Sequence, residues 1–352
     1  MSAAAEPQLT FLRACRQLPV EHTPVWFMRQ AGRYMPEYRA VRQKLTLLEI
    51  CARPEIAAEV TLQPIRAFGV DAAILFSDIL LPLVPMGIDL EFAAGEGPVI
   101  HNPLRNLADV QRLRKIDAQG SLAHVLETVR LVRRELDGKV PLIGFAGAPF
   151  TLASYLIEGG PSKHFLKVKD MMYRQPAAWQ RLLQVLADVV ADYLVAQIEA
   201  GAQAVQLFDS WAGSALSPED YREYALPFSK QIFERIRLAG APAIHFSVGA
   251  GAYLPLLKAA GGDVIGLDWR TAFDWGWRSL NYEVGVQGNL DPAALFAPRE
   301  ELERRVAAIL AAAGGRPGHI FNLGHGILPQ TPVENVRAVV EMVQQYPMRV
   351  DR

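Results

Sequence analysis

The feature that most restricts the fold of this chain is a series of eight short apolar runs, each bounded by glycine, proline or polar residues. Such runs, without polar alternation, are typical of parallel strands buried on both faces. Longer segments separate them, and in residues 179–199 apolar positions recur every three or four residues, which predicts an amphipathic helix. The expected strands are residues 25–28, 71–76, 141–146, 204–208, 243–246, 263–267, 283–286 and 319–323.

The alternation of strand and helix predicts an α/β protein, and eight such units favour a (β/α)₈ TIM barrel over an open doubly wound sheet. The pattern alone does not prove that the barrel closes. No internal repeat or linker rich in glycine, serine or proline divides the chain, so we expect a single domain over residues 1–352. Three helix starts are expected where an N-cap residue precedes a proline, at Ser217-Pro218, Asp291-Pro292 and Thr331-Pro332.

The composition excludes several classes of protein. With 51% hydrophobic and 21% charged residues, the chain has ordinary globular usage. Its 36 lysines and arginines nearly balance 37 aspartates and glutamates, so no overall field attracts nucleic acid or an anionic membrane. Any anionic ligand must therefore meet locally placed cations.

Membrane, secretion and metal signals are weak. No apolar run reaches the roughly 18 residues that a membrane helix needs, and residues 1–17 lack a basic stretch followed by a long apolar one. We therefore expect a cytoplasmic protein. Cys15 and Cys51 form no CxxC or Cys/His cluster, so we expect neither a disulfide nor a zinc site, and both cysteines are expected to be packing residues.

Polar residues follow nearly every expected strand. In a TIM barrel the active site lies at the C-terminal ends of the strands, in the loops that follow them. We therefore expect one site built from these loops. The residues are Arg29, Gln30, Gly32 and Arg33, then Ser77 and Asp78, residues 149–155, Asp209 and Ser210, and finally Ser247, Asp268, Asn289 and His325.

Arg29 and Arg33 carry the strongest anion-binding signal. Four residues apart, they would share one face if the segment were helical. Guanidinium groups stay charged and bind carboxylates bidentately. The alternative is a solvated basic face paired with Glu37, but the position directly after a buried strand favours binding.

Asp78 lies among apolar neighbours in ILFSDILL. A partly buried carboxylate is unfavourable unless it accepts hydrogen bonds or faces a cation, so it indicates a site for a cationic or NH-rich ligand. The alternative is a cap for the following turn.

Two further segments carry candidate ligand contacts. The glycines of GFAGAPFTLASY fit neither a dinucleotide fingerprint nor a phosphate loop, so we expect a substrate-facing loop ending in Tyr155, or else a tight turn packed for its own sake. His325 lies between two glycines at a strand end, which favours a ligand contact. His245, inside an apolar strand, is expected to be a core or supporting residue.

Several segments resemble the uroporphyrinogen decarboxylase family, in the family's order and over essentially the whole chain. Pro161 is a small variation beside one of them. The two long segments are PVWFMRQAGRYMPEY and GFAGAPFTLASYLIEGG, and the shorter ones are FSDIL, QLFDSWAG, GLDW, QGNLDP and FNLGHGI.

The resemblance implies a distorted (β/α)₈ barrel, usually a homodimer with facing active-site clefts. Members of the family remove CO₂ from the four acetate side chains of uroporphyrinogen III to give coproporphyrinogen III in tetrapyrrole synthesis. They use no metal and no organic cofactor. The substrate is a small molecule with eight carboxylates, and neither nucleic acid nor a membrane is involved.

The resemblance also implies roles for individual residues. Asp78 would accept hydrogen bonds from the pyrrole NH groups and stabilise a cation on the protonated ring. Arg29 and Arg33 would bind substrate carboxylates. Arg29 is also a candidate proton donor, although a guanidinium is a poor acid and water or another group stays an alternative.

Other positions complete the implied substrate site. Gln30, Ala31 and Gly32 would complete the arginine loop. Tyr155, Ser210 and His325 would make the remaining polar contacts, with His325 holding a propionate or acetate. Phe208 would line an apolar floor, whereas no role is assigned to Asp268.

Two other functions stay open. Methyltransferases that depend on corrinoid or zinc resemble the family at a low level, but methyl transfer to a thiol calls for a His/Cys/Cys zinc site, and neither cysteine has a histidine at ligand spacing. A tetrapyrrole carrier without activity would use the same arginines and would not need Asp78.

Overall fold

The sheet contains seven parallel strands in the computed structural model, which describes residues 9–93, 97–136 and 138–347. Neighbouring strands follow the order of the chain, as a barrel requires. The fold prediction is confirmed, and two strand predictions, for residues 204–208 and 243–246, coincide with the observed bounds. The strands are β1 (Ala73–Ile74), β4 (Leu142–Gly147), β5 (Ala204–Phe208), β6 (Ala243–Phe246), β7 (Val264–Gly266), β8 (Gly285–Gln287) and β9 (His319–Ile320).

Residues 24–28 take the eighth position without forming a regular strand. Val25 makes an isolated parallel bridge to Phe321 beyond β9. On the other side, the backbone nitrogen of Asp71 donates to the Val25 oxygen at 2.8 Å. The ring is therefore closed, but the predicted strand is reduced to a bridge. Pro24 has no N–H, and the Asp71 carboxylate takes the Val25 N–H at 2.9 Å, so few ladder bonds can form.

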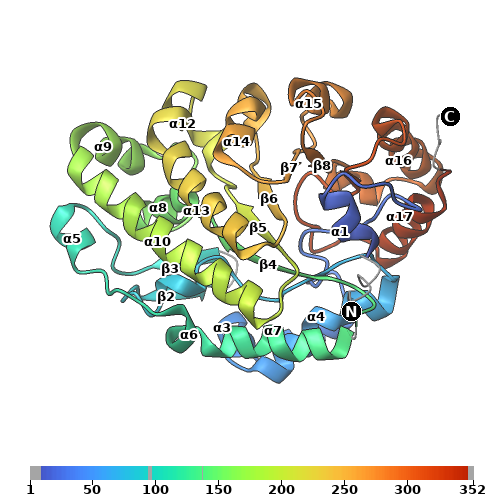
Figure 1. The fold of residues 1–352 in the computed structure, drawn as a ribbon. Helices are drawn as coiled ribbons and strands as arrows, with labels where there is room; N and C mark the ends of the chain where they lie inside the picture. Colours follow the sequence, from blue (N-terminus) through green and yellow to red (C-terminus); the bar gives the residue numbers. More distant parts are fainter. Residues whose placement is uncertain (1–8, 94–96, 137, 348–352) are drawn as a thin grey trace, which may run out of the picture.

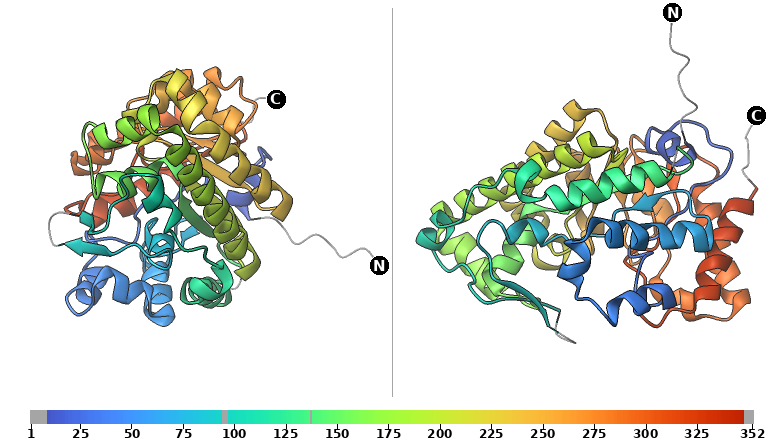
Figure 2. Two further views of the ribbon diagram at one scale, coloured as in Figure 1. Left: turned by 90° about the vertical axis from the view of Figure 1, so that its left-hand side faces the viewer. Right: turned by 90° about the horizontal axis from the view of Figure 1, so that it is seen from below.

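Helices surround the sheet, as Figures 1 and 2 show, and a separate hairpin of β2 (Leu90–Ala93) and β3 (Gly97–Ile100) lies at the periphery. The α-helices are α1 (Thr10–Cys15), α2 (Pro36–Arg42), α3 (Leu47–Cys51), α4 (Pro54–Phe68), α5 (Leu107–Gln111), α6 (Ala118–Ser121), α7 (Ala123–Leu136), α8 (Pro149–Glu158), α9 (Leu166–Arg174), α10 (Pro176–Ala200), α11 (Ala212–Ala215), α12 (Pro218–Tyr224), α13 (Leu226–Ala239), α14 (Leu254–Ala260), α15 (Phe273–Ser279), α16 (Arg299–Ala313) and α17 (Val333–Gln345). Short 3₁₀ helices are η1 (Leu81–Leu83), η2 (Ala250–Tyr253) and η3 (Pro292–Phe296).

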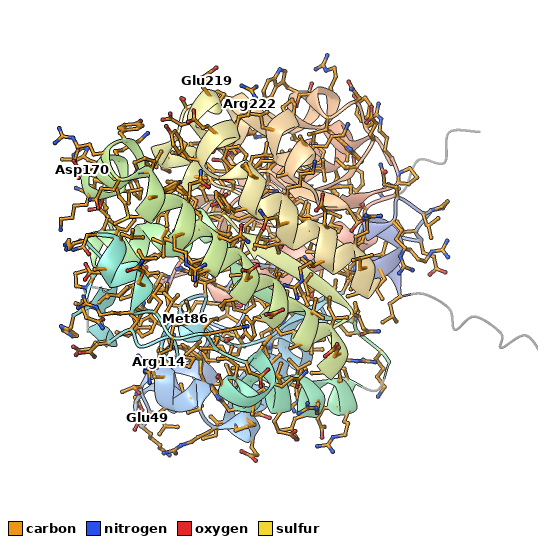
Figure 3. The ribbon with its side chains drawn as sticks, turned by 60° about the vertical axis from the view of Figure 1, so that its left-hand side comes forward. Glu49, Met86, Arg114, Asp170, Glu219 and Arg222 are labelled. Atoms are coloured by element: carbon orange, nitrogen blue, oxygen red, sulfur yellow. The ribbon has the colours of Figure 1, made fainter. Side chains whose placement is uncertain are left out.

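The outer helices bury one face and leave the other in solvent. The helix predicted over residues 179–199 is the main part of α10, which packs against α13 and β4. Figure 3 shows Asp170 of α9 and Glu219 and Arg222 of α12 projecting away from the body of the molecule. The amphipathic pattern of the sequence therefore places its polar face outward.

The predicted helix starts are correct in two cases of three. Ser217 caps α12 by accepting a backbone N–H at 3.1 Å, and Asp291 caps η3 in the same way at 2.9 Å. The prediction for Thr331 is wrong, because Pro332 occupies the cap position of α17. Thr331 is thus one residue too early, and its buried hydroxyl has no partner among the described residues.

A chain of buried amides crosses the interior of the barrel. Trp26 Nε1 donates to Gln287 Oε1, and Gln287 Nε2 donates to Gln206 Oε1, both at 3.0 Å. These bonds satisfy polar groups that would otherwise be unpaired in the core. They tie residues 24–28 to β8 and β5.

No helix in the described part of the chain combines the length and apolarity needed to cross a membrane. The N-terminal stretch used to predict a cytoplasmic protein lies partly outside the described residues, which begin at residue 9.

Candidate active site

Loops at the carboxyl ends of the strands are joined by backbone hydrogen bonds. The nitrogen of Ile327 donates to the Met28 oxygen at 2.9 Å, and that of Gly324 donates to the Leu290 oxygen at 2.8 Å. The loops after β8 and β9 and the segment leading to Arg29 therefore meet at one end of the barrel. This is where the sequence placed the site.

The arginine segment consists of turns and is not helical. Arg29 has a left-handed backbone, with φ of 62°, and α2 begins only at Pro36. The condition under which Arg29 and Arg33 would share one helix face is therefore not met. Both side chains are exposed, and neither forms an ion pair with a described residue, Glu37 included. Both guanidinium groups are available to an anionic ligand.

Gln30 holds this segment in place. Its buried side chain accepts from Phe27 N and donates to Ala72 O, both at 3.1 Å, which ties the segment to the start of β1. Ala31 and Gly32 are partly exposed. A Cβ on Gly32 would lie 2.9 Å from the Arg29 oxygen, so the turn requires glycine there. The Gln30 amide is thus engaged inside the protein.

Asp78 both caps a turn and offers a free oxygen to a ligand, so the two roles considered for it from the sequence are compatible. Its Oδ1 accepts from Leu80 N at 2.9 Å, which caps the turn before η1. Oδ2 accepts no hydrogen bond from a described residue. Burial raises the pKa of Asp78, while the Leu80 N–H and the charge of Arg29 oppose that rise. One oxygen orients the carboxylate and the other stays open.

Arg29 connects the candidate residues electrostatically. Its charge acts on the pKa of Asp78, of Tyr155 and of His325. Arg33 and Asp78 both act on the pKa of Tyr38, which places Arg33 in the same region. We call Arg29, Arg33, Asp78, Tyr155 and His325 the strand-end site. Ser210 is half-buried after β5, but no hydrogen bond links it to these five.

His325 is a neutral hydrogen-bond donor in this setting. Burial lowers its pKa to about 4, and the charges of Arg29 and Arg270 act in the same direction. Its Nδ1 accepts from Gly326 N at 2.7 Å, so the neutral ring carries its proton on Nε2. This N–H can donate to a carboxylate without adding charge.

Aromatic rings pack beside the polar groups. Phe208 is partly exposed and contacts the rings of Phe145 and Phe246, with centroids 5.6 and 6.0 Å away. Tyr155 lies edge-on to Trp211 at 5.7 Å, and burial raises the pKa of its hydroxyl. The end of the barrel thus offers flat apolar surfaces between the charged groups.

The buried carboxyl of Asp209 supports this arrangement, although the sequence analysis assigned it no role of its own. Its Oδ1 accepts from Thr151 Oγ1 at 3.0 Å, and Thr151 Oγ1 accepts from Trp211 N at 3.2 Å. These bonds fix α8, which carries Tyr155, against the loop after β5. The signal in the sequence was an aspartate directly after a buried strand.

Two predictions of packing residues are confirmed. His245 is fully buried, and burial lowers its pKa to about 4. Cys15 and Cys51 are buried and unpaired. Within the described ranges, no group of three or more histidine, cysteine, aspartate or glutamate side chains is arranged to hold a metal ion.

The family model described as "Uroporphyrinogen decarboxylase (URO-D)" matches residues 6–346. The chain belongs to the uroporphyrinogen decarboxylase family. The expected carboxy-lyase class and the place in tetrapyrrole synthesis are confirmed with this membership.

Relatives named uroporphyrinogen decarboxylase agree over almost the full length. The protein of Carboxydothermus hydrogenoformans is 58% identical over 336 residues, covering 96% of each chain. That of Thermus thermophilus is 56% identical over 334 residues, covering 95% of this chain and 97% of the relative. The resemblance in the short segments thus extends to the whole sequence.

Solved structures support the barrel fold. A methyltransferase from Methanosarcina mazei superposes with a TM-score of 0.79 at 20% identity and covers 96% of this chain and 98% of its own. A B12-independent methionine synthase from Shewanella gives a TM-score of 0.58 at 12% identity, over 86% of this chain and 91% of the neighbour. At such identities the likeness concerns the fold alone.

Proposed function

We propose that this member of the uroporphyrinogen decarboxylase family converts the four acetate side chains of uroporphyrinogen III to methyl groups, giving coproporphyrinogen III, without a metal or organic cofactor. The observation that carries the proposal is that Asp78 has an open oxygen and lies within the electrostatic reach of Arg29 at the carboxyl end of the barrel. A carboxylate beside unpaired arginines suits a substrate with NH groups at its centre and carboxylates at its rim.

The reaction needs an electron sink. Breaking the bond between the acetate methylene and CO₂ leaves an electron pair that no carbonyl of the substrate can accept. Protonation of the adjacent pyrrole carbon creates an iminium-like cation, and the electron pair flows into it as CO₂ departs. The methylene carbon then takes up a proton, and the ring proton is lost.

Asp78 supplies the electrostatic part of this mechanism. Its open Oδ2 accepts hydrogen bonds from the pyrrole NH groups and stabilises the cation of the protonated ring. The hydrogen bond from Leu80 N holds the carboxylate before substrate arrives, so little reorganisation accompanies the reaction. Pyrrole NH groups and the charge of Arg29 favour its ionised form.

The other residues of the site bind and orient. Arg29 and Arg33 hold carboxylates, and Tyr155 and the Nε2–H of His325 donate to further polar groups of the substrate. Arg29 is also the candidate proton donor, with water as the alternative, because a guanidinium releases its proton reluctantly. Ala31, Gly32 and Ser210 add contacts from the adjacent loops, and Gln30 fixes the arginine segment.

The test compares wild-type protein, Asp78→Asn and Asp117→Asn. Each chelator-treated protein is incubated anaerobically with uroporphyrinogen III, and the loss of carboxylates is followed by chromatography. Asp117 is a matched control, because this exposed residue also caps a turn through the backbone N–H two positions on, at 3.3 Å. We expect stepwise conversion by wild type and Asp117→Asn, and a loss of about 100-fold or more in Asp78→Asn.

Three results would contradict the proposal. Folded wild-type protein that binds the substrate without converting it would be a carrier. Loss of activity on chelation, restored by zinc, would return the methyltransferase class to consideration. Equal activity of the two aspartate variants would remove Asp78 from the mechanism.

We further propose a cytoplasmic homodimer that associates through the carboxyl end of the barrel. Large apolar side chains are exposed on segments that follow β7, β8 and β9, namely Trp269, Trp275, Phe296 and Leu328. Exposed apolar residues grouped in this way favour a protein interface. Sedimentation equilibrium should give twice the mass of the chain, and cell fractionation should recover the protein with the cytosol.

A further inference from the structure

Arg270, in the loop after β7, is a cation that the strand-end site does not include. Its Nε donates to Oδ2 of Asp268 at 3.0 Å, and its Nη2 lies 2.9 Å from the same oxygen in an ion pair. The Asp268 side chain is 1% exposed, whereas that of Arg270 is 53% exposed. The guanidinium is therefore anchored on its inner edge and open on its outer edge.

The anchor is unusually well fixed for a surface arginine. Asp268 also accepts from Gly249 N at 2.6 Å and from Thr271 Oγ1 at 3.0 Å. Asn289 Nδ2 donates to the backbone oxygens of Asp268 and Thr271, at 2.8 and 2.7 Å. Residues of the loops after β6 and β7 thus bind the buried carboxylate, the loop after β8 holds the backbone beside it, and the carboxylate orients Arg270.

The position of Arg270 places it beside the strand-end site. Its guanidinium stacks over the Trp269 ring at 4.9 Å, and that ring lies edge-on to His325 at 6.1 Å. Arg29 and Arg270 both act electrostatically on His325. The two arginines therefore both lie near His325, whose Nε2–H can itself bind a carboxylate.

A purely structural role would account for only part of this geometry. A guanidinium has five N–H donors, and Asp268 accepts a hydrogen bond only from Nε, with Nη2 in ion-pair contact at 2.9 Å. Nη1 makes no hydrogen bond with any described residue. An arginine locked against a buried carboxylate and stacked on a ring loses little side-chain freedom when it binds a second carboxylate.

We infer that Arg270 is a third carboxylate-binding guanidinium, which holds a peripheral carboxylate of the substrate on the side of His325. This inference rests on the proposed function, because it assigns a further contact to the same polycarboxylate ligand. The carboxylate bound by Arg270 is not the one that leaves as CO₂, because Asp78 and Arg29 contact the ring and the acetate that react. Arg270 therefore contributes to binding, and Asp268 is a positioning residue.

The experiment compares Arg270→Gln and Arg270→Lys with Arg278→Gln. Arg278 is a matched control because it also pairs with an aspartate, Asp274 at 3.1 Å, and is 63% exposed, but on the outer helix α15. We expect Arg270→Gln to raise KM roughly 10- to 100-fold with kcat nearly unchanged. The KM of Arg270→Lys should lie between the KM of wild type and that of Arg270→Gln, because lysine keeps the charge and loses the planar guanidinium.

Equilibrium binding of uroporphyrin III, the oxidised octacarboxylate that cannot react, gives the same comparison without turnover. Its quenching of tryptophan fluorescence should show weaker binding to Arg270→Gln than to Arg278→Gln. A wild-type KM and wild-type binding in Arg270→Gln would overturn the inference. A variant that loses both kcat and thermal stability would also overturn it, because that combination indicates a structural role. Failure of the proposed function can be distinguished from failure of this inference, because in the former case the wild-type protein itself would show no turnover.

Discussion

Asp209 is a carboxyl group with an incomplete set of partners. Thr151 satisfies one oxygen, while Oδ2 is buried without a hydrogen bond from any described residue. Burial raises the pKa of Asp209 to about 7. The hydroxyl groups of Tyr221 and Tyr253 lie within its electrostatic reach. The folded protein thus retains a proton that the unfolded chain releases.

Replacing Asp209 by asparagine should therefore stabilise the protein at alkaline pH. The unfolded carboxyl ionises above its ordinary pKa of 3.8, whereas the folded one stays protonated until about pH 7. The stability contributed by this proton is fully present below pH 3.8 and is lost as the pH rises to 7, a loss on the order of 4 kcal/mol. In urea unfolding, the gain of Asp209→Asn over wild type should be larger at pH 8 than at pH 5. An equal gain at both pH values would contradict this ionisation.

At the scale of elements, two glycines in the loop after β9 have different neighbours, so that one affects stability and the other affects activity. A Cβ on Gly324 would overlap the backbone nitrogen of Trp269, which cannot move without its loop. A Cβ on Gly326 would lie 2.5 Å from Cδ of Arg29, at a flexible side chain. The same loop thus packs rigidly at one residue and leaves room for Arg29 at the other.

We expect Gly324→Ala and Gly326→Ala to fail in different ways. Gly324→Ala should lower the free energy of unfolding by about 1–3 kcal/mol, because two loop backbones must separate. Gly326→Ala should keep its melting temperature and lose turnover, because Arg29 is displaced. Thermal unfolding and kcat/KM for both variants check this. A loss of stability in Gly326→Ala that matches the loss in Gly324→Ala would contradict this expectation, because it would show that the Arg29 side chain cannot move aside.

At the scale of the whole molecule, buried neutral histidines make the fold sensitive to acid. Burial lowers the pKa of His245, His319 and His325 to about 4 in each case. Between pH 6.5 and 4 the unfolded chain binds protons at these positions and the folded protein does not. Their stabilisation is present above pH 6.5 and is lost as pH falls through this window.

The free energy of unfolding should therefore fall as pH drops from 6 to 4.5, by roughly 3 kcal/mol per pH unit after the opposite effect of Asp209 is included. We propose that the barrel unfolds as the single domain expected from the sequence. Urea titrations at several pH values should give one cooperative transition whose midpoint falls with acidity. A flat pH profile, or two separate transitions, would contradict these expectations.

The strands were predictable where burial alone sets the backbone. Residues 204–208 and 243–246 are apolar throughout, lie between two neighbours and form β5 and β6. Residues 25–28 are equally apolar, but they make only a bridge, because Pro24 and the Asp71 side chain alter the hydrogen bonding. Such competition depends on a residue far away in the sequence and gives no local signal.

The position of the candidate site follows from the sequence more readily than its detail. Arg29, Asp78 and His325 were expected to lie near one another because polar residues after buried strands meet at one end of a barrel. The helical arrangement considered for Arg29 and Arg33 does not occur, and the sequence could not exclude it, because a left-handed backbone at a non-glycine residue is set by its surroundings. Arg270 depends on the approach of three loops to Asp268, which no motif reveals.

The bridge between Val25 and Phe321 also sets an order of events during synthesis. The segment that carries Arg29 and Arg33 leaves the ribosome long before its partner beyond β9. A nascent chain must therefore keep this apolar segment unpaired while the strands between the two are made. The arginines reach their working positions only after β9 has been synthesised, so a product truncated before β9 would lack this part of the site.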